Sequence, residues 1–194
     1  MSLESFKKEV ENGRLGRNHG LSIGLSKLEE ITGGLTKSTF TLLFASSGIG
    51  KSSAALYSYV YIPLKEHLED GKIKIIFFAL EMKESFIIAK LLSTYLYDTY
   101  HIRISAKQIL SIGKDYTLPD DIYEYVKLGY EWLEKVYKNL IIFDGAHTSD
   151  KVISEIMQVL KEEGTFEDDH YTPNNPEQTV LAVIDHAGLL IPAN

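Results

Sequence analysis

Hydrophobic and polar positions divide most of the chain into alternating strands and helices. Four short runs are almost continuously apolar, which is typical of strands in a parallel sheet that is covered on both faces. These predicted strands are Phe40–Phe44, Ile73–Leu80, Leu140–Phe143 and Val180–Ile184. Apolar residues at helical spacing predict helices at about 51–68, 84–99, 120–137 and 150–163. Because strands and helices alternate, we expect an α/β fold with right-handed crossovers.

The amino-terminal segment has a separate amphipathic pattern. The apolar residues that recur at helical spacing are Leu3, Phe6 and Val10. Asn12 and Gly13 then break the pattern, which predicts a short helix followed by a polar linker. The apolar face of this helix has two alternative roles, packing on its own domain or docking on a neighbouring subunit. We therefore divide the chain into a helix with its linker, 1–20, and a core, 21–194.

Capping, proline and loop signals add local detail. An S-x-x-E pattern at Ser26 and Glu29 predicts a capping box and a brief helix that ends at Gly33. Pro63 lies inside the first long helical pattern, where it predicts an end or a kink. Residues 164–178 contain a glycine, two prolines and several acidic residues, which predicts an exposed loop.

Composition narrows the class of protein. The chain has 194 residues, of which 44% are hydrophobic, and this suffices for one sizeable core. No apolar run approaches the roughly 20 residues that span a bilayer, so we expect no membrane segment. Cysteine is absent and the start lacks a secretory pattern, so we expect a reducing, cytoplasmic compartment. The net charge of −7 argues against a broad nucleic-acid-binding face, although not against gripping a phosphate backbone with a few residues.

The first predicted strand leads into a run of small residues that predicts a phosphate-binding loop. The stretch ASSGIGKS, which ends at Ser52, matches the P-loop pattern except that alanine replaces the first glycine. Gly48 and Gly50 permit a curled backbone whose N–H groups face phosphate oxygens, and the following helix adds its N-terminal dipole. In this pattern Lys51 binds the β- and γ-phosphates of ATP, and the Ser52 hydroxyl coordinates Mg²⁺. The predicted nucleotide-binding residues are Ser47, Gly48, Ile49, Gly50, Lys51, Ser52 and Ser53.

Three carboxylates follow predicted strands, namely Glu81, Asp144 and Asp185. A P-loop ATPase needs one carboxylate to hold Mg²⁺ and another to orient or deprotonate the attacking water, and the carboxyl ends of parallel strands supply such residues. Each of the three could instead stabilise the N-terminus of the next helix. Glu81 suits the role of activating water, because its side chain is longer. The pattern does not rank Asp144 against Asp185 as the residue linked to Mg²⁺.

The chain resembles the DnaB-like replicative helicases over about residues 20–192. The segments ITGGLTKSTFTLL, ASSGIGKS, FALEM and VIDHAGLL occur in the order that this family shows. FALEM is similar to the family's strand that ends in Leu-Glu-Met, and the IDH segment is similar to the bacteriophage and mitochondrial branch. The resemblance implies a RecA-like P-loop NTPase core with a mainly parallel sheet flanked by helices.

The resemblance also ranks the carboxylates. It implies that Glu81 is the catalytic glutamate, acting with Lys51, and that Asp185 is the aspartate linked to Mg²⁺. Asp144 then becomes a supporting residue. His186 follows the aspartate at a position where relatives carry tyrosine or histidine. We interpret it as a supporting or packing residue, with nucleotide sensing as the alternative.

The implied function is a replicative DNA helicase of the bacterial or phage-infected cytoplasm. Its homo-oligomer, a hexameric ring, would hydrolyse ATP between subunits and move on single-stranded DNA, with a primase or loader as a partner. Family members continue past the aspartate strand, so we expect a truncated core whose DNA contacts lie mostly beyond residue 194. Two alternatives stay open. A RecA-type or clock-type ATPase shares the fold, and a nucleotide-regulated helicase loader or regulator suits the acidic charge.

Overall fold

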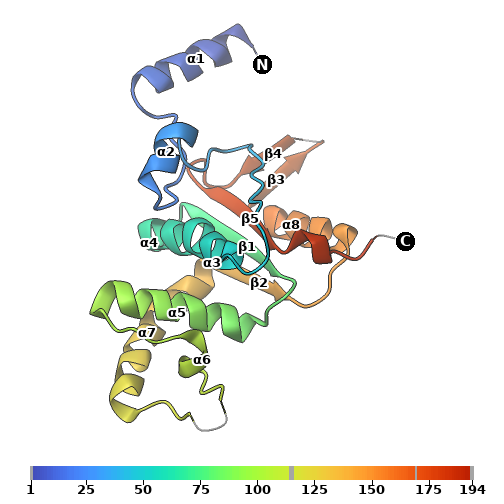
Figure 1. Cartoon of the computed structure of the whole chain (residues 1–194). Coiled ribbons are helices and arrows are strands. Elements are labelled where there is room, and N and C mark those ends of the chain that lie inside the picture. The colour runs from blue at the N-terminus through green and yellow to red at the C-terminus, as the bar shows by residue number, and fades with distance from the viewer. Residues whose placement is uncertain (1, 114–115, 169, 193–194) are drawn as a thin grey trace. The chain divides into compact units, whose positions relative to one another are not determined.

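The computed structural model describes residues 2–113, 116–168 and 170–192. Packing divides the chain into two compact units, Met1–Pro63 and Leu64–Asn194, and each is described by itself. Figure 1 labels the helices and strands of both units. The last two residues of the predicted core, 193–194, lie outside the described ranges.

The amino-terminal helix of the first unit is longer than predicted. α1 (Leu3–Arg14) begins after Ser2, whose hydroxyl accepts a hydrogen bond from the N–H of Ser5 at 3.1 Å. The helix passes through Gly13, because one glycine inside a helix costs only about 1 kcal/mol. The apolar residues Leu3, Phe6 and Val10 are all exposed.

The second helix forms as predicted, but its predicted capping box is wrong. α2 (Ser26–Thr32) ends at Gly33, which has a φ of 73°. Ser26 is the first helical residue rather than the cap, so the side chain of Glu29 reaches back over the preceding turn. There its carboxylate accepts hydrogen bonds from the Ser22 hydroxyl at 2.7 Å and from the N–H groups of Ile23 and Gly24 at 2.5 and 2.9 Å. These contacts, led by the hydroxyl of Ser22, lower the pKa of Glu29 below its ordinary value.

The strand predicted at Phe40–Phe44 is absent, and that prediction is wrong. The segment is irregular, and Phe40, Leu42 and Phe44 are exposed. A strand requires a neighbour that binds its backbone N–H and C=O groups. In the described ranges of the chain, no strand pairing includes these residues.

The helical stretch after the phosphate-binding loop changes from an α-helix to a π-helical turn and back to an α-helix. α3 (Lys51–Leu56) continues into a π-helical turn, η1 (Tyr57–Tyr61), and then into α4 (Ile62–His67). At the end of the π turn, the N–H of Ile62 donates to the carbonyl of Tyr57, five residues earlier. Pro63 has no N–H, and its ring clashes with a regular α turn before it. The predicted disturbance at Pro63 is therefore a π turn, and the helix does not end there.

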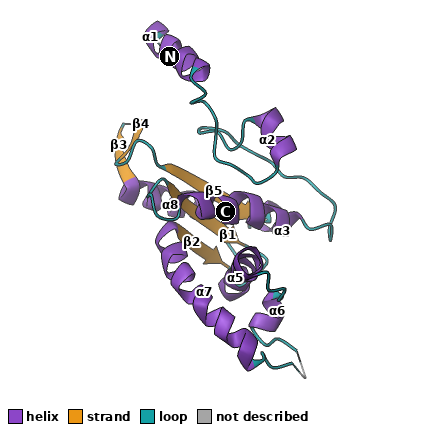
Figure 2. Ribbon diagram, turned by 90° about the vertical axis from the view of Figure 1, so that its left-hand side faces the viewer, coloured by secondary structure: helices purple, strands orange, loops and turns teal. Residues whose placement is uncertain are grey.

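The second unit contains a parallel sheet of three strands. β1 (Ile73–Ala79), β2 (Leu140–Asp144) and β5 (Thr179–Asp185) lie in the order β2-β1-β5, as Figure 2 shows. Three of the four predicted strands are thereby confirmed. The central strand, β1, is buried along most of its length, as its largely apolar sequence predicts.

Three helices of this unit form at the predicted positions, namely α5 (Glu84–Tyr100), α7 (Asp120–Asn139) and α8 (Ser149–Glu163). A short helix that the sequence did not predict, α6 (Ala106–Ile109), packs against α5. Val152 and Val159 of α8 join Ile76 and Phe78 of β1 in one buried cluster. α5 and α7 approach closely at Gly129, where a Cβ would lie 2.3 Å from the Cδ1 of Leu92. Beside that contact, Trp132 of α7 stacks on Tyr95 of α5, with ring centroids 4.5 Å apart.

The segment predicted as an exposed loop contains a hairpin. β3 (Gly164–Glu167) and β4 (His170–Pro173) pair antiparallel, with Phe166 opposite Tyr171. Their rings lie 5.1 Å apart. Asp168 follows β3 with a φ of 52°, a value that aspartate tolerates better than most residues. The loop prediction fails here because threonine and aromatic residues, which favour strands, lie between the acidic and proline signals.

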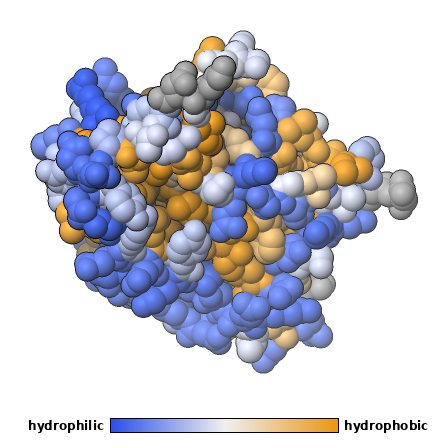
Figure 3. All heavy atoms as spheres, turned by 90° about the horizontal axis from the view of Figure 1, so that it is seen from below, coloured by the Kyte–Doolittle hydropathy of each residue, from blue (hydrophilic) through white to orange (hydrophobic). Residues whose placement is uncertain are grey.

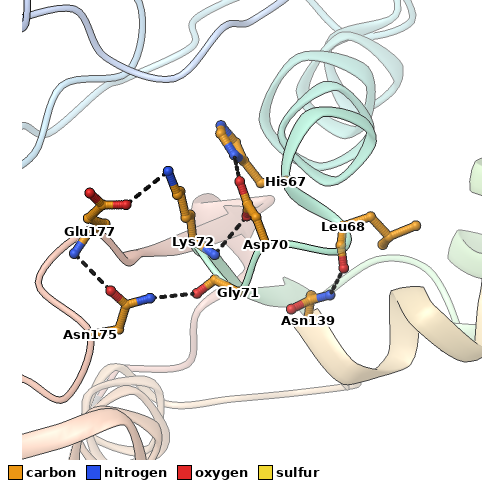
Figure 4. Close-up of polar contacts among 8 residues, drawn as sticks. All are labelled: His67, Leu68, Asp70, Gly71, Lys72, Asn139, Asn175 and Glu177. Atoms are coloured by element: carbon orange, nitrogen blue, oxygen red, sulfur yellow. Dashed lines mark hydrogen bonds and ion pairs between the residues drawn. The ribbon is translucent and has the colours of Figure 1, made fainter.

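A polar network, shown in Figure 4, holds the turn before β1. Its contacts join His67 to Asp70, Lys72 to Asp70 and Glu177, Asn175 to Gly71, and Asn139 to Leu68, at 2.8–3.3 Å. Burial raises the pKa of Asp70, but the contacts with His67 and Lys72 outweigh it, so this pKa lies below its ordinary value. The network connects the start of β1 with the end of α7 and with the segment before β5.

Large hydrophobic side chains are also exposed at the surface. Figure 3 shows hydrophobic residues gathered on one face between hydrophilic ones. On α7 the exposed large side chains include Tyr123, Tyr125, Leu128, Tyr130 and Tyr137.

Among the helices in the described ranges, none has both the length and the apolar character needed to cross a membrane.

Candidate active site

The predicted phosphate-binding loop belongs to the first unit. Residues 47–50 form turns, and α3 begins at Lys51 with Gly50 as its N-cap. Gly48 and Gly50 have φ values of 82° and 95°, which glycine adopts far more readily than other residues. A Cβ at either position would meet nothing within 4 Å. The backbone conformation therefore demands glycine here, and crowding does not.

The side chains of this loop lie at or near the surface. Ser47 and Ile49 are exposed, and Lys51 and Ser52 are half-buried. The N–H of Ala54 donates to the carbonyl of Gly50 at 2.9 Å, which marks the first turn of α3. Backbone N–H groups in the first turn of a helix are suited to binding an anion. The local geometry agrees with a phosphate-binding loop, while the role of each residue stays a prediction.

The three predicted carboxylates meet at one edge of the sheet in the second unit. Asp144 and Asp185 are the last residues of β2 and β5, and both pair in register with Ala79, the last residue of β1. Glu81 follows Ala79 by two residues. The parallel register thus brings the carboxylates to the carboxyl ends of neighbouring strands, where α/β proteins place their ligands.

Burial distinguishes Asp185 from the other two. Asp185 is only 4% exposed, whereas Glu81 and Asp144 are exposed. Its backbone carbonyl accepts a hydrogen bond from the N–H of Leu80 at 2.8 Å, which ties the end of β5 to the residue before Glu81. The peptide bond from Asp185 to His186 is cis.

Asp144 has a contact that the sequence did not reveal. Its Oδ2 accepts a hydrogen bond from the N–H of Glu84 at 2.9 Å, and Glu84 is the first residue of α5. The alternative in which Asp144 caps the next helix, α8, is wrong, because Thr148 caps that helix. Asp144 instead stabilises a helix that precedes it in the chain. Only the pairing of β1 with β2 could have indicated this partner.

Two histidines lie near this edge. His186 is half-buried and precedes the short helix η2 (Ala187–Leu189). His147, which the sequence analysis did not single out, is buried, and its ring contacts Phe78 and Phe143 edge-on at 5.8 and 6.2 Å. Its Nδ1 lies 3.0 Å from the carbonyl oxygen of Gly145. A carbonyl oxygen can only accept, so Nδ1 carries the proton in this hydrogen bond.

The side chains predicted to hold Mg²⁺ carry oxygen donors, the type of ligand that this ion prefers. Within the described residues, no group of three or more His, Asp or Glu side chains could hold a metal by itself. Magnesium usually takes one or two protein oxygens and completes its shell with water and substrate phosphates. The hydroxyl of Ser52 and the carboxylate of Asp185 fit that requirement by type.

The parallel sheet and the phosphate-binding loop are those of an α/β P-loop fold of the RecA-like class. The family described as "DnaB-like helicase C terminal domain" matches residues 20–162, and the chain belongs to this family. The matched range includes the phosphate-binding loop, Glu81 and Asp144, and it ends before Asp185. The predicted resemblance to DnaB-like helicases is confirmed.

A solved structure supports the fold. The chain is similar to a structure described as an "ATPase Domain", with a TM-score of 0.72 and 20% sequence identity. The similarity covers 98% of this chain and 58% of that one, so this chain spans little more than half of its structural relative. No curated protein matches the chain.

Proposed function

We propose that this chain is the ATPase core of a DNA helicase, which couples ATP hydrolysis between the subunits of a ring to movement along single-stranded DNA. The observation that carries the proposal is the family match, because residues 20–162 contain both the phosphate-binding loop and Glu81. A hexameric ring, a primase or loader as partner and a place in a bacterial or phage-infected cytoplasm belong to the same proposal. So does the division into a helix with linker, 1–20, and a core, 21–194.

In this proposal the loop Ser47–Ser53 binds the triphosphate of ATP. Its backbone N–H groups surround the phosphate oxygens, and Lys51 adds a charge-assisted contact to the β- and γ-phosphates. Ser52 and Asp185 would hold Mg²⁺, which neutralises charge on the phosphates when it is bound. The positive φ values of Gly48 and Gly50 support this role, because they give the loop its curl.

Glu81 is the proposed catalytic residue. Its exposed carboxylate, just past the end of β1, would orient the attacking water and accept its proton. Lys51 stabilises the negative charge that moves onto the β–γ bridging oxygen as the bond to the γ-phosphate breaks. The position of Glu81 at the same sheet edge as Asp185 supports this assignment.

The test compares wild-type protein with Glu81→Gln in an assembly-competent form. ATP turnover is measured with and without single-stranded DNA, together with displacement of a labelled strand from a forked duplex. Glu81→Gln keeps the shape of the side chain but cannot accept a proton, so turnover should fall roughly 10²–10⁴-fold while ATP binding persists. Strand displacement should disappear with turnover.

Other outcomes would favour the alternatives. ATP binding without strand displacement by the wild-type protein would favour a nucleotide-regulated loader or regulator. Filament formation on DNA without displacement would favour a RecA-type ATPase. Unchanged turnover in Glu81→Gln would remove Glu81 from the mechanism.

A further inference from the structure

We propose that Asp144 is a positioning residue for Glu81. Its carboxylate holds the first turn of α5, and this contact fixes the turn that carries the proposed catalytic glutamate. The inference rests on the proposed function, because it assumes that Glu81 acts on water. It gives Asp144 a role different from the binding of Mg²⁺, although the sequence pattern alone allows either role.

The turn that carries Glu81 is anchored on both sides. Before it, the N–H of Leu80 donates to the backbone carbonyl of Asp185 at 2.8 Å. After it, the N–H of Glu84 donates to the Oδ2 of Asp144 at 2.9 Å. The two acceptors belong to β5 and β2, the two neighbours of β1. Glu81 therefore lies on a short turn held between both outer strands of the sheet.

Asp144 is itself firmly held. The N–H of the next residue, Gly145, donates to the carbonyl of Ala79 at 3.3 Å, which continues the contact between β2 and β1. The carbonyl of Gly145 accepts from the buried ring of His147, and the carbonyl of His147 accepts from the N–H of Ile191 at 2.9 Å. The segment after β2 is thus fixed by a buried side chain, so the carboxylate is presented to α5 from a rigid base.

The chemistry of the contact predicts which substitutions preserve it. A carboxylate near the N-terminus of a helix is favoured by the helix dipole, and its hydrogen bond is charge-assisted. Asparagine retains an oxygen that can accept from the N–H of Glu84, whereas alanine retains none. A metal-binding carboxylate behaves differently, since an amide oxygen is a poor substitute for it.

The experiment measures kcat and KM for ATP in an assembly-competent protein. Asp144→Ala should lower kcat roughly 10–100-fold, because a small displacement of a catalytic group has an effect of this size, and should leave KM nearly unchanged. Asp144→Asn should restore most of the lost kcat. Asp150→Ala is the matched control, because it removes another carboxylate beside a helix N-terminus, that of α8, and should show wild-type kcat.

Two further measurements separate positioning from a general loss of structure. Amide hydrogen exchange at the start of α5 should rise in Asp144→Ala and stay at the wild-type level in Asp144→Asn. In a Glu81→Gln background, Asp144→Ala should lower the residual turnover no further, because both substitutions act on the same step.

The proposal would be overturned by any of three results. These are wild-type kcat in Asp144→Ala, an equal loss in Asp144→Asn and Asp144→Ala, or a further large loss when Asp144→Ala is added to Glu81→Gln. A failure of the proposed function looks different. In that case Glu81→Gln itself would retain wild-type turnover, while hydrogen exchange would still report whether Asp144 holds α5.

Discussion

Replacing Gly50 by alanine adds one methyl group at the residue from which α3 starts. The backbone there has a φ of 95° and a ψ of 18°, and the methyl group would meet nothing within 4 Å. A clash is therefore excluded as the cause of any effect. The cost arises from holding an L-residue in a left-handed conformation, which is roughly 1–2 kcal/mol.

This cost must appear in one of two measurable quantities. If the substituted loop keeps its conformation, the free energy of unfolding falls by about 1–2 kcal/mol. If the free loop relaxes to a negative φ, the strain returns when nucleotide binds, and the Kd for ATP rises roughly 5–30-fold. Urea unfolding followed by circular dichroism measures the first quantity, and anisotropy of a fluorescent ATP analogue measures the second.

Gly33→Ala is the matched control for Gly50→Ala. Gly33 has a φ of 73° and equally open surroundings, but it ends α2 and lies outside the phosphate-binding loop. It should lose a similar amount of stability and bind ATP with wild-type affinity. If Gly50→Ala matched the wild type in both unfolding and ATP affinity, the conformation described for this loop would be refuted.

Three other substitutions, one of them with a matched control, test separate parts of the chain. Lys51→Ala removes the charge directed at the phosphates and should abolish tight ATP binding in isothermal titration; wild-type affinity would show that ATP binds elsewhere. The Ser22 hydroxyl and nearby N–H groups lower the pKa of Glu29, so the stability from this carboxylate is complete above about pH 4.5 and is lost as the pH falls through its folded-state pKa. Thermal unfolding between pH 7 and pH 3 should therefore show a smaller acid loss in Glu29→Gln, and an equal loss would contradict the assignment. Trp132→Ala should lower the free energy of unfolding by roughly 3–5 kcal/mol in urea, whereas exposed Leu128→Ala should change it by about 0.5 kcal/mol or less. Similar effects of these two changes would mean that the α5–α7 contact is described incorrectly.

The hydrophobic pattern correctly predicted the strands whose apolar side chains are buried in the sheet. β1 is apolar except for Lys74 and is the central strand, so its sequence and its burial agree. Phe40–Phe44 is equally apolar, yet it is irregular and exposed, because pairing depends on a distant partner that the segment itself does not specify. The hairpin of β3 and β4 is the opposite error, because a loop was predicted where two strands form. Acidic and proline residues there outnumber a short alternation of strand-forming side chains.

In the candidate site, too, local features could be predicted from the sequence, whereas contacts between distant residues could not. The glycines of the phosphate-binding loop could be predicted, because positive φ values in a tight turn before a helix are a local requirement. The common edge of the carboxylates followed from parallel strands alone. The contact of Asp144 with Glu84 could not be predicted, because the two residues are 60 positions apart and meet only through the register of β1 and β2.

The π turn at Tyr57–Tyr61 has a consequence for how this chain aligns with its relatives. A π turn holds one residue more than an α turn, so the helix after the phosphate-binding loop carries an inserted residue. That residue lets the helix continue through Pro63, which a regular α turn would not tolerate. Deleting one residue of the turn should therefore destabilise the protein unless Pro63 is replaced at the same time. A relative with an unbroken α-helix here should be one residue shorter and should lack the proline, so the gap and the substitution should occur together in an alignment.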